Sequence, residues 1–261
     1  MADVFANGLT HHVQRIGVSE GRVVVFIHGL VMDNLSSWYF SVANRVAEAR
    51  PCLLYDLRGH GYTERPSRGY DLMSFCTDLA SLLDAQNVSD PVDIVGNSFG
   101  GLLGLVFAQR HPQRVASLVL VDALLPEPGW SDAMTATLSL QGQERDQQIV
   151  KQFSSWLGRN SQRKRNRLAR QASGLVEDTT LLEDIRNSPT FPDSAWSDIS
   201  CPVLALYGAQ SDQRDRGERL HNVLPACTLE VLDGCTHSIL WEATEHLRDR
   251  VLLWMNEVAS K

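Results

Sequence analysis

The chain has 261 residues, of which 43% are hydrophobic, and its formal net charge at pH 7 is −7. It is long enough for one large α/β core, although length alone would also allow two small domains. The acidic balance disfavours nucleic-acid binding. The sequence contains no apolar run near about 18 residues, and its N-terminus does not resemble a leader. We therefore expect a cytoplasmic protein without a membrane span.

Apolar, β-branched runs alternate with amphipathic segments of helix length along most of the chain. This alternation predicts an α/β fold, with parallel strands linked by crossover helices. The expected strands are Val4–Ala6, His11–Ile16, Val23–Ile27, Cys52–Tyr55, Val92–Val95, Ser117–Val121, Val203–Tyr207 and Leu229–Leu232. The expected helices are Leu72–Ala85, Gly101–Arg110, Arg216–Val223 and Thr244–Val258.

The alternation stops between Pro126 and Ile199, where the chain is rich in Gln, Ser, Arg and Asp. We interpret residues 126–199 as a helical lid inserted late in a single domain that spans residues 1–261. Loops at the carboxyl edge of a parallel sheet lie over the ligand site, and a lid belongs there. Three tryptophans fall within this region, where lid packing is favoured over ligand contact: Trp130, Trp156 and Trp196.

A run of basic residues without an intervening acid lies within the insertion of this acidic chain. Its members are Arg159, Arg163, Lys164, Arg165, Arg167 and Arg170. A solvated helix face is the favoured interpretation. The alternative is a docking surface for an acidic partner, such as an acyl carrier protein or a phosphate-bearing thioester.

The segment Gly96-Asn97-Ser98-Phe99-Gly100 follows an apolar run and opens a helix-like segment. A strand, a sharp turn and a helix with serine at the apex are typical of a nucleophile elbow. So tight a turn leaves room only for small residues two positions before and after the serine, and Gly96 and Gly100 meet that need. The helix would direct free N–H groups at the reacting atoms.

A serine nucleophile needs a base to take its proton and a carboxylate to orient that base. Asp212 follows the expected strand Val203–Tyr207, and His237 follows the last expected strand. The chain order Ser98, Asp212, His237 is the one expected when a nucleophile elbow lies in this kind of sheet. Asp122 also follows a strand and is the alternative acid, although we favour a turn-forming role for it.

Two further motifs accompany the elbow: His28-Gly29 directly after a strand, and Asp56-Leu-Arg-Gly-His-Gly61. With them, the chain resembles the α/β-hydrolase family over essentially its whole length. The resemblance implies a mostly parallel eight-stranded sheet flanked by helices. One departure is Thr236, because the residue before the catalytic histidine is usually glycine in that family.

The resemblance also implies the site. Ser98 would be the nucleophile, His237 the base and Asp212 the orienting acid, with the backbone N–H groups of Leu30 and Phe99 as the oxyanion hole. The expected function is hydrolysis of a small-molecule carboxylic ester or acyl thioester through an acyl-enzyme. Carbon–carbon bond hydrolysis or acyl transfer is the first alternative, and a ligand-binding receptor with a slow triad is the second.

We expect no metal and no organic cofactor. Five cysteines without C-x-x-C spacing indicate neither a disulfide framework nor a zinc site. Near the expected oxyanion loop, Trp38, Tyr39 and Phe40 either line an acyl pocket or pack the first helix, and the sequence favours neither.

Overall fold

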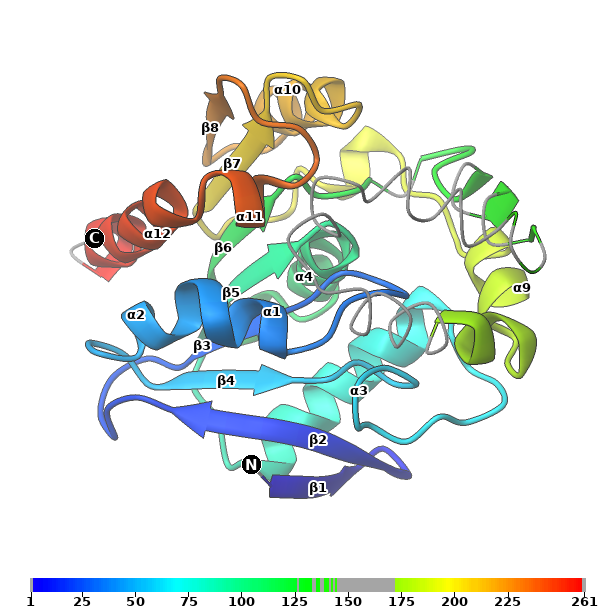
Figure 1. The fold of residues 1–261 in the computed structure, drawn as a ribbon. Coiled ribbons are helices and arrows are strands. Elements are labelled where there is room, and N and C mark those ends of the chain that lie inside the picture. Colours follow the sequence, from blue (N-terminus) through cyan, green and yellow to red (C-terminus); the bar gives the residue numbers. More distant parts are fainter. Residues whose placement is uncertain are drawn as a thin grey trace.

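The computed structural model describes residues 2–125, 127–132, 135–136, 139–140, 142, 144 and 172–259. Its strands form an eight-stranded sheet in the order β1-β2-β4-β3-β5-β6-β7-β8 (Figure 1). The strands are β1 (Ala2–Ala6), β2 (Leu9–Ile16), β3 (Val24–Ile27), β4 (Cys52–Tyr55), β5 (Val92–Asn97), β6 (Val115–Val121), β7 (Val203–Gly208) and β8 (Cys227–Leu232). The six strands from β4 to β8 in this order run parallel, and β1 and β2 are antiparallel to their neighbours. The predicted α/β sheet is thus confirmed.

The four predicted helices are also confirmed. They are α3 (Leu72–Ala85), α4 (Phe99–Arg110), α10 (Arg214–Val223) and α12 (Thr244–Ala259). At the start of α3 the Asp71 carboxylate accepts hydrogen bonds from the N–H groups of Met73 and Ser74, an N-cap that fixes where this helix begins. Shorter helices that the sequence did not reveal are α1 (Ser36–Trp38), the π-helix η1 (Tyr39–Ala43), α2 (Asn44–Val46), α9 (Leu181–Arg186) and α11 (Ile239–Glu242).

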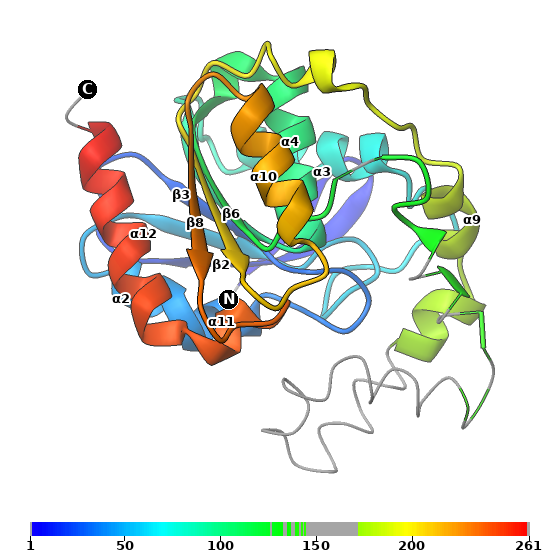
Figure 2. The same cartoon turned by 90° about the horizontal axis from the view of Figure 1, so that it is seen from above.

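Helices cover both faces of the sheet. Figure 2 shows α3, α4 and α10 on one side, with α2, α11 and α12 on the other. Strand β3 contributes to both layers, because Val25 and Ile27 belong to one buried cluster and Val24 and Phe26 to the other. A parallel strand buried on both faces is a continuous apolar run, which is why periodicity of two is absent here.

Trp38 packs the first helical segment. Its side chain is fully buried against the ring of Phe26, and its indole N–H donates to the carbonyl oxygen of Ile27 at 2.9 Å. Phe40, by contrast, is 72% exposed. The packing alternative therefore holds for Trp38.

The helical insertion lies between β6 and β7. Figure 1 shows α9 beyond the carboxyl ends of the parallel strands. Trp130 and Trp196 are buried, as expected for packing residues. Trp156 and the basic run from Arg159 to Arg170 lie outside the described residues, and the lid and docking roles remain predictions. None of the helices in the described ranges combines the length and apolar character needed to cross a membrane.

Candidate active site

Ser98 lies at the apex of the turn between β5 and α4, with φ of 53° and ψ of −115°. This left-handed conformation is unfavourable for a residue with a side chain and is retained at functional sites. The flanking glycines make the turn possible. A Cβ on Gly96 would lie 2.3 Å from the carbonyl oxygen of Gly100, and a Cβ on Gly100 would lie 2.2 Å from that of Ile27. The steric need for Gly96 and Gly100 is as the sequence predicted.

His237 lies on the loop that follows β8, and its ring reaches the elbow. The Nε2 atom is 3.0 Å from the Ser98 hydroxyl oxygen, which is within hydrogen-bond distance. The side chain is 34% exposed, so a water molecule or substrate can approach it. The structure thus brings Ser98 and His237 together.

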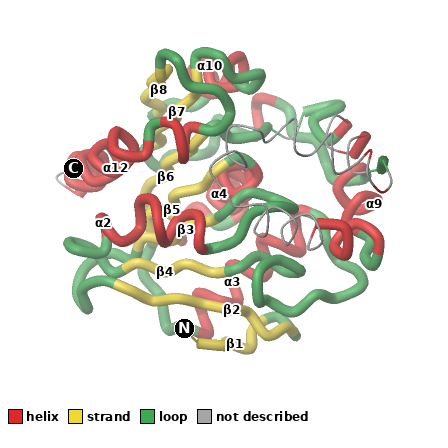
Figure 3. Tube along the Cα trace, in the orientation of Figure 1, coloured by secondary structure: helices red, strands yellow, loops and turns green. Residues whose placement is uncertain are grey.

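Asp122 orients the other side of the His237 ring. Its Oδ2 atom is 2.6 Å from Nδ1 of His237, and its side chain is fully buried. The Gly208 N–H donates to Oδ1 at 2.8 Å, and the Ser211 hydroxyl donates to Oδ2 at 2.5 Å. Three donors therefore satisfy a buried carboxylate, as burial of a charge requires. Ser98 and Asp122 directly follow β5 and β6, and His237 lies on the loop after β8. These strands, labelled in Figure 3, belong to the parallel part of the sheet, so their carboxyl ends lie at one edge.

The expectation that Asp212 orients His237 is wrong. Asp212 is exposed, four residues beyond the end of β7, and its backbone carbonyl lies 3.5 Å from Arg216 at the start of α10. Asp122 follows β6 directly and has a left-handed φ of 46°, a conformation that aspartate tolerates better than most residues. The loop after β7 supplies donors to the acid and does not supply the acid itself.

Ser211 is a member of the site that sequence reasoning missed. Besides donating to Asp122, its hydroxyl oxygen accepts the N–H of Gln213 at 3.0 Å. Serine is common in turns, so the segment Gly208-Ala-Gln-Ser carried no signal beyond a turn.

Thr236 replaces the usual glycine before His237 and anchors the histidine loop. Its N–H donates to Glu242 Oε2 at 2.7 Å, and its hydroxyl lies 2.9 Å from Oε1. The same hydroxyl accepts the N–H of Ser238 at 3.2 Å. These bonds hold the residues on either side of His237, so the departure from the family pattern is compatible with a well-defined loop.

The loop after β3 lies against the elbow. A Cβ on Gly29 would lie within 3.6 Å of the Asn97 side chain and 3.8 Å of its carbonyl oxygen. Leu30 follows directly and is buried. Phe99 is the first residue of α4, where a backbone N–H has no partner within the helix. The oxyanion role of the Leu30 and Phe99 amides remains a prediction.

The loop after β4 supports this arrangement through Asp56. Its Oδ1 accepts the N–H of Leu35 at 2.8 Å, and its Oδ2 accepts that of Tyr62 at 2.9 Å. Arg58 in the same motif pairs with buried Asp78 through two bonds of 2.6 and 2.5 Å. The aspartate and arginine of this motif therefore tie its loop to neighbouring elements.

Buried His60 should make the free energy of unfolding depend on pH. Burial, and secondarily the neighbouring His28 ring, lowers its pKa from 6.5 to about 3. Between pH 6.5 and about 3 the unfolded chain binds a proton that the folded chain does not. The contribution of neutral His60 to the free energy of unfolding is therefore fully present above pH 6.5 and is lost as the pH falls toward about 3. For one proton the slope reaches about 1.4 kcal/mol per pH unit. We expect His60→Gln to flatten the pH dependence of the unfolding free energy in urea titrations, and slopes equal to wild type would contradict the neutral burial of His60.

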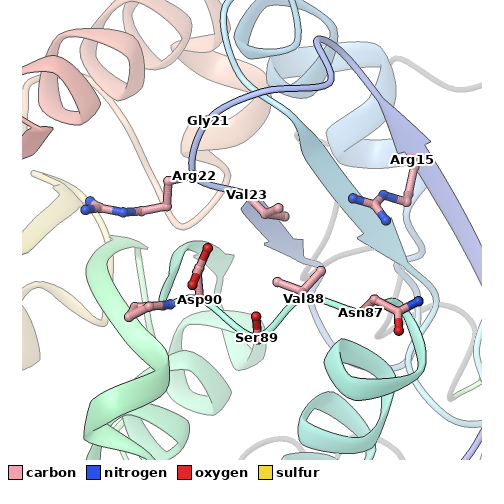
Figure 4. Close-up of a pocket in the computed structure, with 9 residues that line it drawn as sticks. Arg15, Gly21, Arg22, Val23, Asn87, Val88, Ser89 and Asp90 are labelled. Carbon is pink, nitrogen blue, oxygen red and sulfur yellow. The ribbon is translucent and has the colours of Figure 1, made fainter.

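A cavity of about 400 Å³ lies elsewhere, at the amino ends of β3 and β5 (Figure 4). Arg15, Arg22, Asn87 and Asp90 are among its lining residues. Ser98 follows the carboxyl end of β5, so this cavity is at the opposite edge of the sheet. Ligands of open parallel sheets bind at the carboxyl edge, and the site therefore is at Ser98.

The chain belongs to the alpha/beta hydrolase fold family, whose model matches residues 22–244. The fold, the elbow and the hydrogen-bonded Ser98 and His237 are consistent with this membership. Some relatives of the chain are named as hydrolases, and others are named as a decarboxylase and a chloroperoxidase.

One curated relative is 2-hydroxy-6-oxo-2,4-heptadienoate hydrolase from Pseudomonas putida, 38% identical over 124 residues. That match covers 46% of this chain and 44% of the relative, so the chain spans less than half the length of this relative. Among solved structures, the meta-cleavage product hydrolase from Pseudomonas fluorescens superposes with a TM-score of 0.79 at 21% identity over 98% of both chains. An esterase from Rhodococcus superposes with 0.82 at 20% identity, again over 98% of both. At these identities the two structures establish the fold alone.

Proposed function

We propose that the protein is a serine hydrolase that cleaves a carboxylic ester or an acyl thioester through a covalent acyl-Ser98 intermediate. The observation that carries the proposal is the continuous contact from the Ser98 hydroxyl to His237 and on to buried Asp122. A serine hydroxyl is a poor nucleophile, and an adjacent oriented base overcomes this.

In the first step, the Ser98 oxygen attacks the substrate carbonyl carbon while its proton moves to Nε2 of His237. The proton on Nδ1 stays directed at Asp122, whose carboxylate stabilises the imidazolium that forms. Negative charge develops on the former carbonyl oxygen, and the Phe99 and Leu30 N–H groups are the proposed donors to it.

In the next steps, the imidazolium of His237 gives its proton to the departing alcohol or thiol, and the acyl group stays on Ser98. A water molecule then attacks this ester while His237 takes a proton from the water. The second tetrahedral intermediate collapses, the proton returns to Ser98, and the free carboxylic acid leaves. These steps use only residues of the chain and water.

Hydrolysis of a carbon–carbon bond is the second candidate function. The observation that favours it is the 38% identity, within the matched segment, to a hydrolase of 2-hydroxy-6-oxo-2,4-heptadienoate. The elbow sequence Gly-Asn-Ser-Phe-Gly-Gly also resembles that group. Both candidates require Ser98 and His237, so the bond that is cleaved must be determined with substrates.

A substrate panel tests the proposal. We expect wild-type protein to hydrolyse p-nitrophenyl esters of short and long acyl chains or acyl thioesters, with kcat lowered by about 10⁴-fold or more in Ser98→Ala. A kcat/KM for 2-hydroxy-6-oxo-2,4-heptadienoate well above that of every ester and thioester would favour the second candidate. Labelling of Ser98 by a fluorophosphonate without turnover of any substrate would indicate a receptor-like protein.

A further inference from the structure

Val31, in the loop after β3, has a strained backbone. Its φ is 70°, and it is buried. Left-handed φ values are uncommon for residues with side chains and are true outliers for β-branched ones. Within the described ranges, the non-glycine residues with positive φ are Asn7, Val31, Asn87, Ser98 and Asp122. Of these, Val31 alone is β-branched, so its conformation needs a compensating interaction.

His60, from the loop after β4, supplies that interaction. Its Nε2 accepts the Val31 N–H at 2.7 Å, and its Nδ1 lies 2.8 Å from the carbonyl oxygen of Arg58. A ring nitrogen that accepts an amide proton carries no proton itself, so Nδ1 must be the protonated nitrogen and donates to Arg58. The two bonds therefore require one tautomer of the neutral ring, and its burial favours that neutral form.

The peptide bond between Gly29 and Leu30, which precedes the one that His60 contacts, is also fixed. Nδ1 of His28 lies 2.7 Å from the carbonyl oxygen of Gly29, and Nε2 of the same ring accepts the Leu57 N–H at 3.0 Å. The N–H of Leu30 belongs to the peptide plane whose carbonyl His28 holds, and in a trans peptide it points the opposite way. The next plane, between Leu30 and Val31, is the one that His60 holds.

We propose that His60 is a positioning residue for the oxyanion hole, because its bond to the Val31 N–H holds the strained peptide next to the Gly29–Leu30 peptide, whose plane carries the Leu30 N–H and whose carbonyl oxygen His28 contacts. The inference rests on the proposed function, in which the Leu30 amide receives the developing negative charge. His60 itself touches neither the substrate nor Ser98 in this account. An oxyanion donor must be aimed before the reaction, and a small error in its direction is costly.

A pair of amide substitutions tests the proposal. In His60→Gln the side-chain oxygen reaches about as far as Nε2 and can accept the Val31 N–H, whereas in His60→Asn the same amide is one methylene shorter. With p-nitrophenyl butyrate as the probe, we expect kcat to fall about 10- to 100-fold in the Asn variant, with KM within about twofold of wild type. The Gln variant should retain most of the wild-type kcat.

Rates of Ser98 phosphonylation by a fluorophosphonate should follow the same ranking, because negative charge also develops on oxygen in that reaction. Equal kcat values in the Asn and Gln variants, whether high or low, would overturn the proposal. So would a loss confined to KM. Circular dichroism of both variants establishes that folded proteins are compared.

A double-mutant comparison isolates the strain at Val31. Glycine adopts the left-handed conformation at no steric cost, so Val31→Gly should reduce the dependence on His60. We expect His60→Asn to lower kcat by a smaller factor in the Val31→Gly background than in wild type. An equal or larger factor would mean that the His60 bond does not act by holding Val31.

The outcome for wild type separates this inference from the proposed function. If wild-type protein neither turns over an ester nor reacts with the fluorophosphonate, the proposed function fails and with it the basis of the inference. If wild type reacts and the Asn and Gln variants behave alike, only the role of His60 fails.

Discussion

Replacing Asp122 with Asn is expected to lower kcat by about 10⁴-fold while the protein stays folded. An amide can donate its NH₂ group to Nδ1 of His237, which favours the tautomer that has its proton on Nε2. That ring cannot accept the Ser98 proton. The loss should be seen in kcat with any substrate of the panel, because the defect lies in the base and not in substrate binding.

Asp212→Asn is the matched control for this change. Asp212 is exposed, and Nδ1 of His237 contacts Asp122 instead, so the variant should keep kcat within about twofold of wild type. The opposite ranking of the two variants would return the orienting role to Asp212. Circular dichroism and thermal unfolding of both proteins show whether the Asp122 variant retains its fold.

Ser98→Ala should lower kcat by about 10⁴-fold or more and abolish labelling by a fluorophosphonate, because the hydroxyl oxygen is the proposed nucleophile. Ser89→Ala is a suitable control, since Ser89 is exposed and lines the cavity at the opposite edge of the sheet. We expect this variant to label and turn over like wild type. Wild-type labelling of Ser98→Ala would place the nucleophile elsewhere.

The elbow could be predicted from the sequence because its chemistry is local. Gly96, Ser98 and Gly100 lie within five positions, and the steric limits that select the glycines act over the same short distance. The strands and longer helices were predictable for a similar reason, since each carries its pattern within one segment. Their observed bounds differ from the expected ones by at most two residues at each end.

The acid could not be chosen from the sequence because the choice depends on contacts between distant segments. Both Asp122 and Asp212 follow a strand, and both precede His237 in the chain. What distinguishes them is the left-handed backbone at Asp122 together with donors from Gly208 and Ser211, which are 86 and 89 residues away. A turn-forming aspartate and an orienting aspartate look alike when these partners are not known.

The contacts of His60 were hidden for the same reason. The sequence places His28 and His60 within the two motifs that accompany the elbow, and it carries no signal for their partners. Their exchange of hydrogen bonds with Leu57 and Val31 needs the pairing of β3 with β4, which brings the two loops together. The strain at Val31 carries no sequence signal, because valine is an ordinary residue beside a buried strand.

Trapping the acyl-enzyme tests the central claim most directly. Wild-type protein would be mixed with an excess of a p-nitrophenyl ester, quenched in acid during turnover and examined by mass spectrometry of the intact chain and its peptides. In wild type we predict a mass increase equal to that of the acyl group, located on Ser98. In Ser98→Ala this increase should be absent. Turnover by wild-type protein with no acyl adduct on Ser98, or with the adduct on another residue, would contradict the account.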